Sequence, residues 1–77
     1  MRYKVGDVVE VVGDEEYYSR RGDIVKVIEV KDYLAFPYKC KILFDHLLNE
    51  IISDDRIHFR DSELKKLPEK IALAYLI

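Results

Sequence analysis

The sequence has few of the residues on which metal sites, disulfide-bonded proteins and many enzymes depend. Its 77 residues include one cysteine, two prolines, three glycines and no tryptophan. A single cysteine excludes an internal disulfide and leaves no cysteine and histidine spacing typical of a metal site. No apolar run approaches the roughly 20 residues that span a bilayer, and the N-terminus has no signal-peptide pattern. We therefore expect a cytoplasmic protein without membrane contact, metal or cofactor.

Motifs for catalysis are equally scarce. The glycines lie too far apart for a phosphate-binding loop and are followed by strand-forming residues. The serines stand in no nucleophile elbow, and neither histidine has a neighbouring cysteine or paired carboxylate. The acidic runs at residues 14–16 and 54–55 are more typical of solvated loops than of a cation site. The sequence therefore predicts that this protein is not an enzyme.

The composition is that of one small globular domain. Apolar residues make up 49% and charged residues 36% of the chain, which is typical of neither a disordered nor a membrane protein. A chain this short buries only about 60% of its unfolded surface, which leaves little material for an enzyme cleft. The net charge is −2, although residues 20–41 alone sum to +3. So modest a basic block argues against strong non-specific binding to DNA.

Residues 22–30 predict the central strand of a sheet. Apolar side chains fall on both faces of this extended segment, so it has to be covered on two sides. Upstream, Gly6 and Asp7 predict a tight turn. The β-branched run that follows favours a strand in which Val9 and Val11 face inward.

The segment 38–45 predicts a further strand with one apolar face. Its inward positions are Tyr38, Cys40, Ile42 and Phe44. Cys40 is therefore expected to be a small buried hydrophobic residue and not a nucleophile, because no neighbour in sequence would lower the pKa of its thiol.

Residues 46–55 allow two interpretations. The helical spacing of Leu47, Leu48, Ile51 and Ile52 favours one or two amphipathic turns. The same residues are compatible with a hairpin extension of the preceding strand.

Residues 56–60 alternate clearly, with Ile57 and Phe59 inward, and predict a short strand. A single tight helical turn then follows, in which Asp61 is expected to accept backbone N–H bonds. Residues 65–67 are expected to complete a closed barrel as its last short strand.

Residues 5–11, 21–28 and 59–64 together carry a family resemblance. Their glycine-punctuated short strands, and the Phe-Arg-Asp-Ser-Glu-Leu run, resemble the small SH3-like barrels, which include KOW-type modules and bacterial or phage domains of the same layout. The resemblance implies a mainly all-β fold, a five-stranded SH3-like barrel over residues 1–67 with a 3-10 turn before its last strand. It also implies a role in binding RNA, protein or both, although this chain is acidic where RNA-binding members are usually basic.

The tail, residues 68–77, lies beyond the resemblance. Pro68 followed by Glu69 is typical of a helix start. From Ile71 onward the Tyr75 hydroxyl is the one polar side-chain group, so a helix here needs cover on more than one side. The tail is expected either to plug an open end of its own barrel or to meet a partner or a second copy of the chain.

Aromatic and basic residues in two loops and one strand form the candidate partner-binding site. Such side chains stack bases, pair with phosphates and also make hot spots in protein interfaces. The alternative is that the rings complete a small core. Together with the apolar tail, the candidates are Tyr17, Tyr18, Arg20, Arg21, Tyr33, Phe36, Lys39, Lys41, Leu73, Tyr75, Leu76 and Ile77.

Two functions follow from these surfaces. The first is a non-catalytic protein-interaction module, such as a small bacterial or phage regulator or inhibitor, that engages its partner through the two loops and the tail. The second is a KOW-like accessory of transcription or translation that touches RNA with Arg20, Arg21, Lys39 and Lys41. The negative net charge and the apolar tail favour the first.

Overall fold

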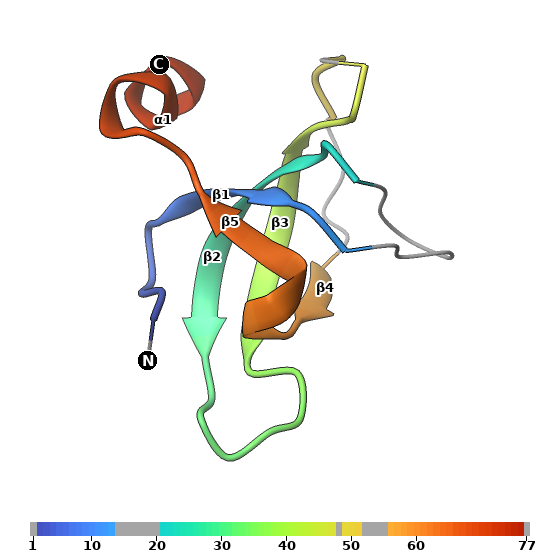
Figure 1. Cartoon of the computed structure of the whole chain (residues 1–77), viewed down its shortest axis with the longest axis vertical. Coiled ribbons are helices and arrows are strands. Elements are labelled where there is room, and N and C mark those ends of the chain that lie inside the picture. The colour runs from blue at the N-terminus through green and yellow to red at the C-terminus, as the bar shows by residue number, and fades with distance from the viewer. Residues whose placement is uncertain (1, 14–20, 48, 52–55, 77) are drawn as a thin grey trace.

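One antiparallel sheet makes up most of the protein (Figure 1). The computed structural model describes residues 2–13, 21–47, 49–51 and 56–76. Within them lie five strands, β1 (Val8–Val11), β2 (Ile24–Val30), β3 (Tyr38–Phe44), β4 (Arg56–Phe59) and β5 (Leu64–Lys66), and a 3-10 turn, η1 (Asp61–Glu63). The strand order is β4-β3-β2-β1-β5. The mainly-β class, the central position of β2 and the 3-10 turn before the last strand are confirmed.

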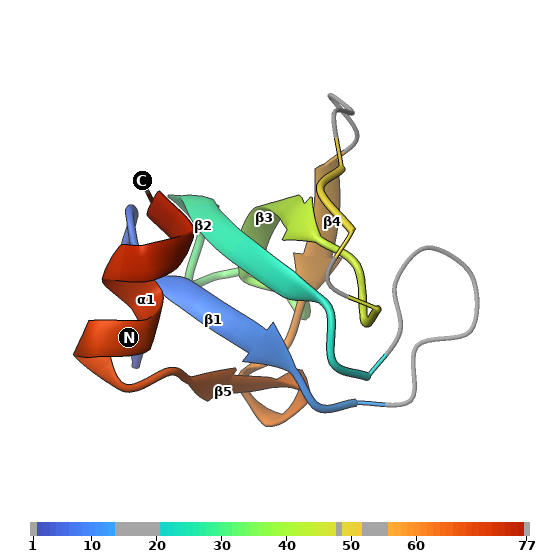
Figure 2. The same cartoon turned by 90° about the horizontal axis from the view of Figure 1, so that it is seen from above.

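The sheet is strongly curved but open, so the expectation of a closed barrel is wrong (Figure 2). In the described part of the chain β4 and β5 are the two edges and do not pair with each other. Their lengths give the reason, since β4 has four residues, β5 has three, and the three-residue η1 reverses the chain directly between them.

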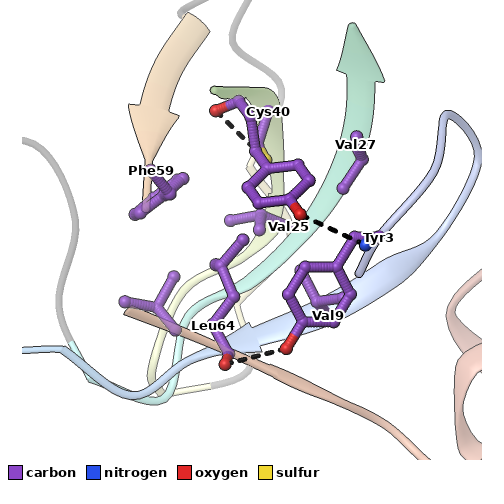
Figure 3. Close-up of a cluster of buried hydrophobic side chains, with 9 residues drawn as sticks. Tyr3, Val9, Val25, Val27, Cys40, Phe59 and Leu64 are labelled. Atoms are coloured by element: carbon purple, nitrogen blue, oxygen red, sulfur yellow. Dashed lines mark hydrogen bonds between the residues drawn. The ribbon is translucent and has the colours of Figure 1, made fainter. Parts of the chain in front are cut away.

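The core fills the inward face of the curved sheet (Figure 3). Alternation along the strands places Val9 and Val11 of β1 and Val25 and Val27 of β2 there, each with no exposed surface. The remaining buried members of this cluster are Tyr3, Tyr38, Cys40, Phe59 and Leu64. The predicted inward positions of Val9, Val11, Tyr38, Cys40 and Phe59 are thus confirmed. Ile42 and Ile57 are partly buried against the same cluster, whereas Phe44 is not part of it.

Two tyrosines supply the polar contacts inside this core. The rings of Tyr3 and Tyr38 meet edge to face, with centroids 5.2 Å apart. The Tyr3 hydroxyl donates to the Leu64 carbonyl at 3.0 Å, and the Tyr3 N–H donates to the Tyr38 hydroxyl oxygen at 3.3 Å (Figure 3). Burial, and next a hydrogen bond with Asp61, raise the pKa of Tyr38. Tyr3 therefore ties the N-terminal segment to the edge strand β5.

Replacing Tyr3 by phenylalanine is expected to lower the free energy of unfolding by about 1–2 kcal/mol, because the buried Leu64 carbonyl loses its donor. For a domain of this size, that is a fall of roughly 4–15 °C in melting temperature, measurable by circular dichroism. Tyr33→Phe is the matched control, because Tyr33 is 77% exposed. Equal melting temperatures for the wild type and both variants would contradict this role of the Tyr3 hydroxyl.

The chain doubles back after β3 in a tight turn. The Asp45 carboxylate accepts the backbone N–H groups of Leu47 at 2.9 Å and Asn49 at 2.8 Å. The Asn49 backbone contact is the first cause of a lowered pKa of Asp45. Glu50 then pairs with Phe44 in an antiparallel bridge. The described residues of this segment therefore form the hairpin extension, while residues 48 and 52–55 lie outside the described part.

The cap of η1 differs from expectation. No side chain of the N-cap residue caps this turn. The carboxylate of Glu63 accepts the Arg60 backbone N–H at 2.9 Å instead. Asp61 interacts with the Tyr38 hydroxyl. The expected capping role of Asp61 is therefore wrong, because its side chain has a partner in the core.

Two glycines shape the ends of the strands. Gly6 and Gly22 have φ angles of +97° and +99°, a conformation that side-chain-bearing residues rarely adopt. At Gly22 an added Cβ would also lie 3.2 Å from the Cβ of His46. Glycine at this position thus lets the 45–47 turn approach the start of β2.

The last described segment is α1 (Glu69–Leu76), which lies beside β1 (Figure 2). The Ile71 N–H donates to the Pro68 carbonyl at 2.9 Å. Ile71 and Leu73 remain about half exposed. Over the described ranges, no helix has the length and apolar character needed to cross a bilayer.

Candidate functional site

The structure describes the predicted site residues unevenly. Tyr17, Tyr18, Arg20 and Ile77 lie outside the described residues, as do the side chains of Tyr75 and Leu76. Arg21 is exposed just before β2, whereas Tyr33 and Phe36 lie in the connector after it (Figure 1). Seven extended residues separate these positions by roughly 20 Å. Arg21 and Tyr33 are therefore not brought together, and the tail residue Leu73 lies on a different element.

The connector between β2 and β3, residues 31–37, presents an apolar surface. Tyr33 is 77%, Leu34 40% and Phe36 38% exposed. The loop is closed by backbone bonds from the Lys31 N–H to the Pro37 carbonyl at 2.9 Å and from the Leu34 N–H to the Lys31 carbonyl at 3.1 Å. These bonds hold the apolar side chains on a defined backbone, which lowers the entropy lost when a partner binds.

Arg60 joins this surface from another part of the chain. Its guanidinium lies over the Phe36 ring, 4.4 Å from the ring centroid, a cation–π contact. Arg60 was not among the predicted site residues. The alternation of residues 56–60 could place Arg60 outside the core, but no local pattern relates it to a ring 24 positions earlier.

A small hollow lies next to the connector on the outward face of the sheet. It has a volume of about 50 Å³ and is lined by Glu29, Lys31, Leu34, Pro37, Lys39 and His58. Pockets for small-molecule ligands are typically about 300–1,000 Å³. The hollow therefore suits the end of one side chain of a partner and not a cofactor.

The charges around the hollow are organised by Glu29. Its carboxylate lies 3.1 Å from the Lys31 amine and 3.7 Å from the Lys39 amine. The hydrogen bond with Lys31, and then the charge of Lys31, lower the pKa of Glu29. The hydrogen bond with Glu29 in turn raises the pKa of Lys31. The predicted site residue Lys39 is thus present, with its charge partly compensated.

The other predicted lysine of β3, Lys41, stands in a row of positive charges. The strand register pairs Lys41 with Lys26 of β2 on one side and with Arg56 of β4 on the other. We call Lys26, Lys41 and Arg56 the cation row. Lys26 and Arg56 were not predicted as site residues, because the alignment depends on register shifts between Ile24 and Val25 and between Val27 and Glu29.

One pair of side chains has the composition of a catalytic dyad. The His46 Nδ1 lies 3.5 Å from the buried Asp23 carboxylate. Cys40 lies in the core, and burial raises the pKa of its thiol to about 12, which makes it a poor nucleophile. Within the described ranges, no group of three or more metal-ligating side chains comes together. The Asp23–His46 contact fastens the 45–47 turn to the start of β2.

Comparisons of the chain with protein-family models, with curated proteins and with solved structures find no match. No family is therefore shown for this chain, and the surface described above is the basis for proposing a function.

Proposed function

We propose that this chain is a non-catalytic protein-binding module that holds its partner against the 31–37 connector and the adjoining outward face of the sheet. One observation carries the proposal. Three large apolar side chains, Tyr33, Leu34 and Phe36, are exposed on a single loop closed by backbone hydrogen bonds. Aromatic residues beside arginine are typical of interface hot spots. The adjacent hollow has the size for a single anchoring side chain.

The proposal also includes an SH3-like fold, a helical tail and a cytoplasmic role, as expected from the sequence. The strand order and the η1 turn before β5 support an SH3-like arrangement that is open between its edge strands. The tail is proposed to be helical, to rest on β1 and to offer Ile71 and Leu73 to the partner or to a second copy. A cytoplasmic regulator or inhibitor, of bacterial or phage type, is the role that fits such a module.

Affinity capture with matched variants tests the connector. Tyr33→Ala combined with Leu34→Ala is expected to reduce capture of a protein partner at least tenfold in quantitative mass spectrometry, because these side chains supply the apolar contact. Leu47→Ala is the control, since Leu47 is 70% exposed but lies in the turn after β3.

Two results would contradict the proposal. One is equal capture by the wild type and the double variant. The other is a captured species that nuclease treatment releases. A shortened chain ending at Pro68 tests the tail separately, because loss of the same partner would show that the tail contributes to binding.

RNA binding is the second candidate function, and the cation row is the observation that favours it. Lys26, Lys41 and Arg56 place three positive charges side by side on an otherwise acidic chain. Contacts with phosphate would make affinity fall steeply as salt is added, whereas apolar protein contact would hardly change.

A further inference from the structure

We propose that the partner of this module presents an acidic segment of polypeptide, and that the cation row of Lys26, Lys41 and Arg56 binds its carboxylates. The inference rests on the proposed protein-binding function and specifies the chemistry of the partner.

The three side chains of the cation row share the outward face of the sheet. Their neighbours along the strands, Val25, Val27 and Cys40, are fully buried in the core on the opposite face. Side chains alternate between faces, so Lys26 and Lys41 face away from the core, as does the exposed Arg56 of β4. Residues in register on neighbouring strands lie about 4.5–5.5 Å apart between Cα atoms. The row therefore spans three strands at close spacing.

A row of like charges is unfavourable in the free protein. Like charges directly opposite each other on neighbouring strands destabilise a sheet. In the part of the chain that the structure describes, neither Lys26 nor Lys41 forms an ion pair. Lys41 stands in the middle, with a cation on both sides. Carboxylates arriving from a partner would relieve the repulsion between Lys26 and Lys41, which is how a binding surface differs from a surface optimised for stability.

The surroundings favour an acidic polypeptide over a nucleic acid. The ionised Glu29 lies beside the row, in register with Lys39, and would repel a continuous phosphate backbone. Single-stranded nucleic acids also need aromatic platforms for successive bases, but Arg60 covers the Phe36 ring, which leaves Tyr33 as the exposed ring of the connector. The net charge of −2 opposes the approach of a polyanion. A short protein segment of mixed acidic and apolar residues brings fewer negative charges to this surface than a phosphate backbone and has no bases to stack, so these obstacles weigh less on it.

The hollow accounts for the apolar part of such a segment. Lys39 follows the same outward face as Lys41, two positions along β3, and lines the hollow together with Leu34 and Pro37. A segment that lies across β2, β3 and β4 can therefore place carboxylates on the cation row and one apolar side chain in the hollow. An extended chain advances about 6.5 Å between side chains of one face, which is also the step from Lys39 to Lys41 along β3.

Direct binding of defined probes tests the inference. The probes are a labelled 12-residue peptide with glutamates and one leucine at every second position and serine between them, the same peptide with lysine for glutamate, and a 12-nucleotide single-stranded RNA of uridine. We expect the glutamate peptide to bind most tightly in fluorescence anisotropy. Lys26→Gln combined with Lys41→Gln should weaken it about tenfold, the effect of losing two exposed ion pairs.

The matched control is Lys65→Gln combined with Lys66→Gln. It removes the same charge from exposed positions of β5, where Lys65 pairs in register with Glu10 and not with a cation. We expect less than a twofold change in affinity for the glutamate peptide. In the absence of peptide, Lys26→Gln with Lys41→Gln should raise the melting temperature by roughly 2–8 °C, because it removes like-charge contacts, whereas the control variant should not.

Several outcomes would overturn the inference. RNA bound more tightly than the glutamate peptide, and lost in the Lys26 and Lys41 variant, would assign the cation row to nucleic acid. The inference is also wrong if the wild type and that variant bind the glutamate peptide with equal affinity. It is wrong as well if the wild type does not bind the glutamate peptide. If the captured partner is lost with the Tyr33 and Leu34 changes but kept with the Lys26 and Lys41 changes, the protein-binding function stands and the acidic partner does not.

Discussion

Phe59→Ala is expected to lower the free energy of unfolding by about 3–5 kcal/mol, the cost of removing a large aromatic side chain from a packed core. Phe59 has no exposed surface and is the only fully buried residue of the four in β4. It stands in register with Tyr38 of β3, the one strand with which β4 pairs. The Phe59 ring is therefore the largest apolar contact of the edge strand with the core, beside the partly buried Ile57.

The size of this effect matters because the domain is small. Chains of this length have a total stability of roughly 4–12 kcal/mol, so the variant should be largely unfolded in mild denaturant. Urea titration followed by circular dichroism measures the change. His58→Ala, one residue earlier on the exposed side of the same strand, is the control and should change stability by about 0.5 kcal/mol or less. Similar denaturation midpoints for the two variants would show that β4 is held in another way.

The strands were predictable because each has a simple local pattern. Alternation placed Val9 and Val11, and Ile57 and Phe59, on the correct face, since the period of two along a strand is a property of the backbone itself. The apolar segment 22–30 identified β2, which lies between β3 and β1 and is the central strand of the sheet.

Contacts between distant segments were not predictable. Tyr3 is buried because its ring meets Tyr38, 35 residues later, and its hydroxyl reaches Leu64, 61 residues later. The expected cap by Asp61 failed for the same reason, because the core hydroxyl of Tyr38 competes for that carboxylate. Whether the sheet closes also depends on whether the short edge strands β4 and β5 pair with each other. No sequence pattern within either strand determines this.

The sequence named some residues of the candidate surface but did not predict how they are arranged in space. Tyr33, Phe36, Lys39 and Lys41 do lie at or near one surface, on the connector and the outward face of β3. Arg21 belongs to the other end of β2. Lys26, Arg56 and Arg60 were missed because register shifts and a loop contact decide their neighbours. The surface therefore depends on which residues the strand pairing places side by side.

The buried thiol of Cys40 is expected to make the protein less stable in alkali. Cys40 has no exposed surface, and burial raises the pKa of its thiol from an ordinary value of 9.0 to about 12. The unfolded chain therefore loses the thiol proton near pH 9, while the folded chain keeps it. The stabilisation from the protonated thiol is complete below pH 9 and is lost as the pH rises toward 12, at up to about 1.4 kcal/mol per pH unit.

The thiol alone should thus lower the free energy of unfolding by roughly 2–3 kcal/mol between pH 8 and pH 11. Urea titrations at intervals of half a pH unit measure this slope, and Cys40→Ala is the comparison. The alanine variant starts less stable at pH 8, because it leaves a cavity, but its stability should fall less steeply. The raised pKa of Tyr38 acts in the same direction in both proteins and cancels in the difference between them. Parallel slopes for the two proteins would mean that the thiolate is tolerated in the core, and that the inward face of β3 admits water.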